Sequence, residues 1–128
     1  MRAPQPRRLL LVRRDNLGDL VFASALTPPL HERFPNASIT LWCKAYTRDI
    51  GALVPHVDRV IAADPYWDRA PGRGRGNLLQ FLLSMLRVRR GGFDTAILGA
   101  SPWRTARAVA QCGIPVRVGL ERRRNSRW

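Results

Sequence analysis

The stretch Arg7-Arg8-Leu9-Leu10-Leu11-Val12-Arg13-Arg14-Asp15-Asn16-Leu17-Gly18-Asp19-Leu20 decides the fold of this chain. Its apolar run, residues 9–12, has the length and composition of a strand that is buried in a parallel sheet. A polar turn containing a glycine follows, and residues 20–26 have helical character. A strand, a turn and a helix form the first half of a βαβ unit. Ligands of open α/β sheets bind beyond the carboxyl ends of such strands, so we expect the functional site there.

The remainder of the chain continues this alternation of strands and helices. Pro28 and Pro29 are expected to kink or end the first helix, because a proline inside a helix costs about 3 kcal/mol or more. Asn77 is expected to cap a long helix that stops at Gly91-Gly92. After the first strand, at 8–12, strands are predicted at 37–42, 57–62, 93–98 and 115–120, and further helices at 30–34, 46–53, 77–89 and 103–112.

Strands separated by helical segments of roughly ten residues indicate a parallel sheet with right-handed crossovers. The predicted fold class is therefore α/β, a Rossmann-like three-layer α/β/α arrangement. We expect one such domain over residues 7–120, preceded by a basic leader at 1–6 and followed by an unstructured basic tail at 121–128.

Composition favours a folded domain outside the membrane. The chain has 128 residues, of which 45% are hydrophobic, enough for one buried core. Its longest mainly apolar run, residues 78–86, is much shorter than the roughly 20 residues of a transmembrane helix. The N-terminus lacks the pattern of a signal peptide, so a cytoplasmic location is expected. Cys43 and Cys112 have no metal-binding spacing and are expected to be buried, inert thiols.

The net charge of +13 predicts an anionic partner. Lys44 is the only lysine among the 22 basic residues, so the arginine bias reflects overall composition as much as a design for binding nucleic acid. The arginines also lie in separate clusters along the chain. Charge alone leaves open whether the partner is a nucleotide, a phosphorylated glycolipid or a membrane surface.

Asp19 is the strongest catalytic candidate, because it follows Gly18 in the first turn of the helix after the first strand. A glycine there permits a tight turn and the close approach of a ligand. A carboxylate presented to the crevice can act as a general base on a hydroxyl group. The alternative is that Asp19 only complements the helix dipole.

Several cations and a helix start are candidates for binding anions. Arg13 and Arg14 follow the first strand, where their planar guanidinium groups are suited to phosphates and carboxylates, or are simply solvated. Ser101 and Arg104 begin the helix after the fourth strand, where backbone N–H groups can bind an anion, although Ser101 can equally serve as a plain cap.

The predicted helix at 77–89 is apolar on more than one face. Packing on the sheet accounts for one face. The other is either buried as well, or meets a further domain, a partner chain or the bilayer interface beside its terminal arginines.

Taken in order, these segments resemble a known family. The succession Arg8-Leu9-Leu10-Leu11-Val12-Arg13, Asn16-Leu17-Gly18-Asp19-Leu20-Val21 and Arg33-Phe34-Pro35-Asn36-Ala37 is similar to the start of glycosyltransferase family 9, the heptosyltransferases of lipopolysaccharide core assembly. The similarity continues through Val57-Asp58-Arg59-Val60-Ile61, Gly91-Gly92-Phe93-Asp94 and Arg117-Val118-Gly119-Leu120, and so covers nearly the whole chain.

The resemblance implies the N-terminal, acceptor-binding half of a GT-B fold. It implies a metal-independent, inverting sugar transfer, in which Asp19 is the base and Gly18 is the glycine of the family's GD turn. The implied acceptor is a phosphorylated glycolipid. The candidate residues for binding it, or another anion, are Arg13, Arg14, Asn16, Gly18, Ser101 and Arg104. No cofactor is implied beyond a nucleotide-sugar donor, expected to be ADP-heptose and held by a C-terminal domain. Peripheral contact with the inner membrane is a further implication, and no specific nucleic-acid partner is expected.

Two departures from the family pattern set expectations of their own. The sequence stops at Trp128, where the family continues into the donor domain, so we expect a fragment that is inactive alone. Residues 97–101, Ile-Leu-Gly-Ala-Ser, replace an Asp-Leu-Gln-Gly-like stretch of the family, which puts acceptor specificity in question. The alternative hypothesis is a non-catalytic basic Rossmann-like module that binds nucleic acid or anionic lipid.

Overall fold

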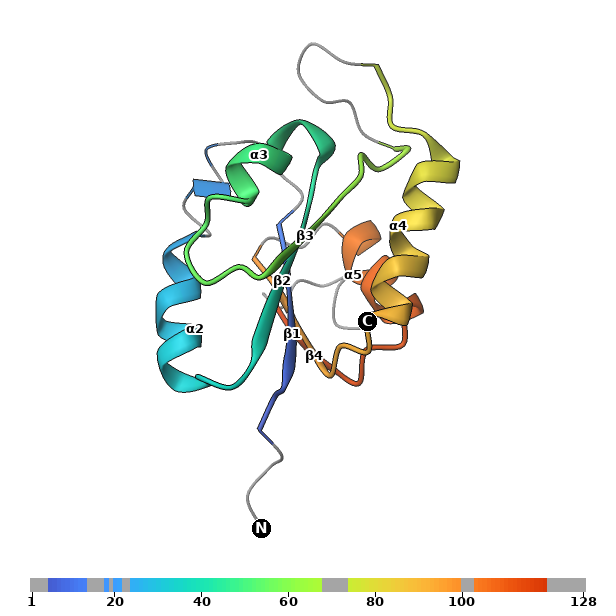
Figure 1. Cartoon of the computed structure of the whole chain (residues 1–128). Helices are drawn as coiled ribbons and strands as arrows, with labels where there is room; N and C mark the ends of the chain where they lie inside the picture. The colour runs from blue at the N-terminus through green and yellow to red at the C-terminus, as the bar shows by residue number, and fades with distance from the viewer. Residues whose placement is uncertain are drawn as a thin grey trace.

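A single parallel sheet of five strands forms the centre of the molecule (Figure 1). The computed structural model describes residues 5–13, 18, 20–21, 24–67, 74–99 and 103–119. The order of the strands across the sheet is β3-β2-β1-β4-β5, and every neighbouring pair is parallel. This arrangement confirms the predicted Rossmann-like α/β class. The strands are β1 (Arg8–Val12), β2 (Ser38–Cys43), β3 (Arg59–Ala62), β4 (Thr95–Leu98) and β5 (Val116–Val118).

Helices cover both faces of the sheet and make the three layers that the sequence predicts. In Figure 1, α2 and α3 lie on one face, and α4 and α5 lie on the other. Gly18, Leu20 and Val21 are also in helical conformation, directly after β1. The helices are α2 (Thr27–Arg33), α3 (Arg48–Gly51), α4 (Leu78–Arg90) and α5 (Trp103–Gln111), with 3-10 turns at Ser24–Leu26 and Ala45–Thr47.

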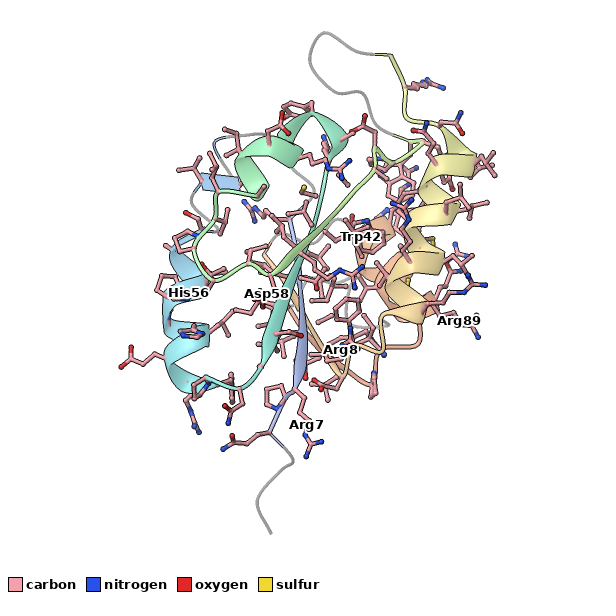
Figure 2. All side chains as sticks on the ribbon, viewed as in Figure 1. Arg7, Arg8, Trp42, His56, Asp58 and Arg89 are labelled. Atoms are coloured by element: carbon pink, nitrogen blue, oxygen red, sulfur yellow. The ribbon has the colours of Figure 1, made fainter. Side chains whose placement is uncertain are left out.

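Strand β1 is the centre of two separate hydrophobic cores. Leu9 and Leu11 pack into the core beneath α2 and α3, whereas Leu10 and Val12 pack into the core beneath α4 and α5. The second core also contains Trp42, whose ring stacks on Phe81 of α4 at a centroid distance of 6.0 Å (Figure 2). The continuous apolar run at 9–12 is thus explained by burial on both faces.

Two aspartates join neighbouring strands at their starts. Asp58, directly before β3, donates its N–H to the carbonyl of Ile39 at 2.8 Å and accepts the Ile39 N–H on Oδ2 at 2.8 Å. Asp94, directly before β4, repeats this reciprocal pair with Arg8 at 3.1 and 3.0 Å, and its Oδ2 also accepts the Arg7 N–H at 2.8 Å. Figure 2 shows Arg7, Arg8 and Asp58 at this end of the sheet. Each carboxylate therefore helps to set the register of a parallel pair.

The double proline does not act as expected. Residues 24–26 form a 3-10 turn, and α2 then begins at Thr27 with Pro28 and Pro29 inside its first turn, instead of beginning at Leu30. The first N–H groups of a helix have no partner within it, so prolines lose no hydrogen bond at this position. The prolines therefore start a helix here rather than only ending one.

The expectations for α4 and for the cysteines are confirmed. The Asn77 side chain accepts the N–H groups of Leu79 at 2.8 Å and Gln80 at 3.3 Å, as an N-cap does. Gly92 then adopts a left-handed backbone, with φ of 65°, just beyond the helix. Cys43 and Cys112 are both buried and unbridged. Within the described part of the chain, no helix has both the length and the apolar character needed to span a bilayer.

We expect the Asp94→Ala variant to lower the free energy of unfolding by about 1–3 kcal/mol, because it removes the charged acceptor of two backbone N–H groups. Urea denaturation measures this loss. The control is Glu32→Ala on the exposed surface of α2, with an expected change within about 0.5 kcal/mol. Equal effects of the two changes would contradict the role of Asp94 in joining β1 to β4.

Candidate functional site

The candidate site lies at the switch point of the sheet, between β1 and β4. From β1 the chain builds the sheet through β2 to β3 on one side, and then returns to place β4 and β5 on the other. Such a reversal leaves a crevice beyond the carboxyl ends of the two central strands, where ligands of α/β proteins bind. Arg13 follows β1 and Gly99 follows β4. Their N–H groups donate to the carbonyls of Trp42 and Val12, both at 3.0 Å, and so extend the ladder by one residue.

The Arg13 side chain reaches from the end of β1 to the end of β4. A Cβ atom placed on Gly99 would lie 3.0 Å from Arg13 Cδ and 3.3 Å from its Nη1. The absence of a side chain at Gly99 therefore makes room for the Arg13 guanidinium, which is half-buried at the switch point. A guanidinium group in this position is suited to a carboxylate or phosphate of a ligand.

Gly18 has no conformational need to be glycine. It lies in helical backbone, and the left-handed glycines among the described residues are Gly92 and Gly113 instead. A Cβ at Gly18 would meet no atom within 4 Å. The expectation that Gly18 permits a tight turn is therefore not supported. Glycine inside a helix is less stable than alanine by about 0.5–1 kcal/mol, so helix stability does not favour a glycine here. The close approach of a ligand at Gly18 stays a prediction.

A second cation lies at the same edge of the sheet and was missed by sequence reasoning. Lys44 directly follows β2, and its residue is only 4% exposed. An ammonium group is buried only where charged or polar partners surround it. The signal was present, since the chain retains a single lysine and places it just after a strand. Lys44 thus adds a buried positive charge to the edge of the sheet where Arg13 also lies.

An aromatic cleft of about 240 Å³ opens between α4 and α5. Trp67 packs edge-to-face on Phe81 at 4.9 Å between ring centroids, and the Arg104 guanidinium lies 5.3 Å from the centroid of the Trp103 ring. Arg107 and Tyr66 also line the cleft. Sequence reasoning selected only Arg104 of this set, because residues 66–67 and 103–104 are separated in the chain and meet only through the fold.

The predicted site residues thus fall into three groups. Arg13 and Gly18 lie on the chain as it leaves β1 at the switch point. Arg104 lies on the neighbouring α5 and lines the aromatic cleft. The other candidates lie outside the described residues, so their roles stay predictions. They are Arg14, Asn16, Asp19 and Ser101.

Comparison with known proteins finds similarity in structure only. No family model matches the chain, and no curated protein matches it in sequence. Among solved structures, ADP-heptose lipopolysaccharide heptosyltransferase II of E. coli is 19% identical, with a TM-score of 0.72, over 93% of this chain and 32% of its own. A family 9 glycosyltransferase of Veillonella parvula is 17% identical, with a TM-score of 0.74, over 89% of this chain and 32% of its own.

A third structure is E. coli heptosyltransferase WaaC with ADP-2-deoxy-2-fluoro heptose, which is 17% identical, with a TM-score of 0.71, over 89% of this chain and 36% of its own. The chain therefore spans about a third of the length of the structures it matches. At these identities the likeness defines the fold, which is one found within family 9 glycosyltransferases. The resemblance seen in the sequence is confirmed at this level.

The Gly18→Ala variant is expected to leave the free energy of unfolding unchanged or to raise it by up to about 1 kcal/mol, because alanine is the better helix residue. Gly92→Ala is the matched control. Its left-handed backbone should make the same change destabilising by about 1–2 kcal/mol. Thermal unfolding of both variants measures the difference, and a Gly18→Ala loss as large as that of Gly92→Ala would restore a purely conformational role for Gly18.

Proposed function

We propose that this chain is the acceptor-binding part of a glycosyltransferase that transfers a sugar to a phosphorylated glycolipid of the lipopolysaccharide core. The observation that carries the proposal is the fold shared with solved heptosyltransferases over about nine-tenths of the chain. The half-buried Arg13 at the switch point adds support, because an acceptor with phosphate or carboxylate groups needs a positively charged crevice. The donor in this proposal is a nucleotide-sugar, ADP-heptose, held by a second domain across the crevice in a GT-B arrangement. The proposed sugar transfer requires no metal and takes place on the cytoplasmic side.

Arg13 is the proposed anchor for an anionic group of the acceptor. Its guanidinium lies between the ends of β1 and β4, where a bidentate interaction would both bind the acceptor and fix its orientation. The aromatic cleft between α4 and α5 offers ring faces and Arg104 to the remainder of the acceptor. Holding the acceptor hydroxyl in one orientation supplies a large part of the rate of a two-substrate reaction.

Asp19 is the proposed general base. Asp64 comes shortly after the end of β3, and its Oδ1 already accepts the Ala45 N–H at 3.0 Å. The residues that follow β1 and β4 in the described structure provide cations and glycines, not acids. The turn at 14–19 is therefore the natural source of a base. Open space around Gly18, beside Asp19 in sequence, would let the acceptor hydroxyl come close.

In the proposed reaction, the Asp19 carboxylate takes the proton of the acceptor hydroxyl as its oxygen attacks the anomeric carbon of the donor sugar. The bond from that carbon to the diphosphate breaks, and the nucleoside diphosphate leaves with the bonding electrons. A single direct displacement inverts the configuration at the anomeric carbon.

Asp19→Asn, introduced into the protein as the cell produces it, is expected to lower the rate of sugar transfer by about 10²- to 10⁴-fold, because an amide cannot accept the proton. Acceptor affinity, measured by calorimetry, should be nearly unchanged. Asp49→Asn, on exposed α3, is the matched control and should keep full turnover. Full turnover of the Asp19 variant would rule out this residue as the base.

Arg13→Gln is expected to weaken binding of the phosphorylated acceptor about tenfold or more, because it removes charge-assisted hydrogen bonds. Gly99→Val should act similarly, since its side chain would occupy the place of the Arg13 side chain. Binding of the dephosphorylated acceptor should change little in both variants. The control is Arg48→Gln on exposed α3. Equal losses for both forms of the acceptor would contradict the role of Arg13 as an anion anchor.

A further inference from the structure

Helix α4 has a second apolar face that is exposed in the described structure. The packed face places Phe81, Ser84 and Val88 against the sheet, each at most 3% exposed. Five leucines on the rest of the helix are exposed, and a contiguous apolar surface of this kind marks a site of interaction. They are Leu78 at 51%, Leu79 at 65%, Leu82 at 50%, Leu83 at 48% and Leu86 at 40%.

The exposed leucines form one continuous strip along the helix, which we call the leucine strip. Leu78, Leu82 and Leu86 follow one another at intervals of four residues, and Leu79 and Leu83 form the adjacent row. Because residues four apart stack on the same side of a helix, the two rows make one surface about 12 Å long. In Figure 1, α4 lies at the outer side of its layer, away from α2 and α3.

Arginines lie at the C-terminal end of the leucine strip and on the adjacent α5, and neither α4 nor α5 contains an acidic residue. Arg87, Arg89 and Arg90 occupy the last turn of α4. Figure 2 shows Arg89 extending away from the sheet. The adjacent α5 adds Arg104 and Arg107, both exposed. A helix with an apolar strip and a cluster of arginines has the composition of helices that lie in the interface of an anionic bilayer.

The same features argue against other occupants. A second copy docked around a two-fold axis would bring the arginine clusters of both copies together, and like charges in an interface oppose association. A nucleic acid would bind the arginines through its phosphates but would leave the leucines unused. A second domain that faces the switch-point crevice would cover the carboxyl edge of the sheet, rather than the outer side of α4.

We propose that α4 docks this protein on the surface of an anionic lipid bilayer. The leucine strip enters the boundary between headgroups and acyl chains, and the arginines in the last turn of α4 bind the lipid phosphates. Leu78 and Leu82 also line the aromatic cleft, so the cleft opens beside the docked surface. If the proposed function holds, a lipid-anchored acceptor would enter the crevice from that side, but bilayer binding itself does not rest on sugar transfer.

Vesicle flotation of the full chain tests the leucine strip. Vesicles of phosphatidylcholine with about 30% phosphatidylglycerol should bind the protein at physiological salt, and vesicles of phosphatidylcholine alone should bind it much less. The double variant Leu79→Gln, Leu83→Gln is expected to lower the partition coefficient about tenfold or more. Neither leucine lines the cleft, so the fold should be kept, as circular dichroism can verify. Leu53→Gln, at an exposed site (77%) just beyond α3, is the matched control and should bind as the unchanged protein does.

A second set of variants tests the charge. Arg87→Gln, Arg89→Gln and Arg90→Gln together should abolish the preference for anionic vesicles. The control triple, Arg33→Gln, Arg48→Gln and Arg59→Gln, removes the same charge from exposed positions of α2, α3 and β3, and should keep that preference.

Three outcomes would overturn the proposal. The first is equal vesicle binding by the leucine double variant and the unchanged protein. The second is a dimer in analytical ultracentrifugation that the double variant converts to a monomer, without vesicle binding. The third is tight, salt-dependent binding to DNA with none to vesicles. Loss of vesicle binding with unchanged transfer to a water-soluble acceptor would support the docking surface, whereas loss of transfer with intact vesicle binding would count against the proposed function alone.

Discussion

The structure depends on the burial of β1 on both of its faces and along both of its edges. Residues 9–12 are at most 1% exposed, so no water reaches their backbone N–H and carbonyl groups. Those groups must be paired by neighbouring strands, here β2 on one side and β4 on the other. Parallel neighbours require crossover connections. The chain leaves β1 toward β2 and β3 on one side, and after β3 it crosses back to place β4 on the other side of β1. The switch point is therefore a direct consequence of the central position of β1.

Charges are divided between the two ends of the sheet. At the starts of the strands, Asp58 and Asp94 are used to join neighbours through backbone hydrogen bonds. At the carboxyl edge, Arg13 and Lys44 lie buried or half-buried beside the ends of β1 and β2. The chain has only nine acidic residues. Because two of them join strands at the starts of the sheet, positive charge dominates elsewhere on the protein. An excess of positive charge at the carboxyl edge favours anionic ligands.

The aromatic cleft and the outer face of α4 present the same kind of chemistry. The aromatic cleft combines Arg104 and Arg107 with Trp67 and Trp103, and the leucine strip has arginines at its end. A phosphorylated glycolipid in an anionic bilayer has both kinds of group, in its headgroup and in the surface that holds it. One fold would thus bind the acceptor at its strand ends and the membrane along one helix.

Interactions between residues close in sequence could be predicted from the sequence alone. The apolar run at 9–12, the Asn77 cap and Gly92 beyond α4 depend on neighbours within a few positions. Such local patterns were enough to predict the parallel α/β class. Contacts between distant segments could not be predicted. Arg7 meets Asp94 across 87 positions, Arg13 lies against Gly99, and the aromatic cleft joins the loop after β3 to α5. The order of the strands in the sheet decides these contacts, because it brings together segments that are far apart along the chain. It also decides which apolar face of α4 is buried.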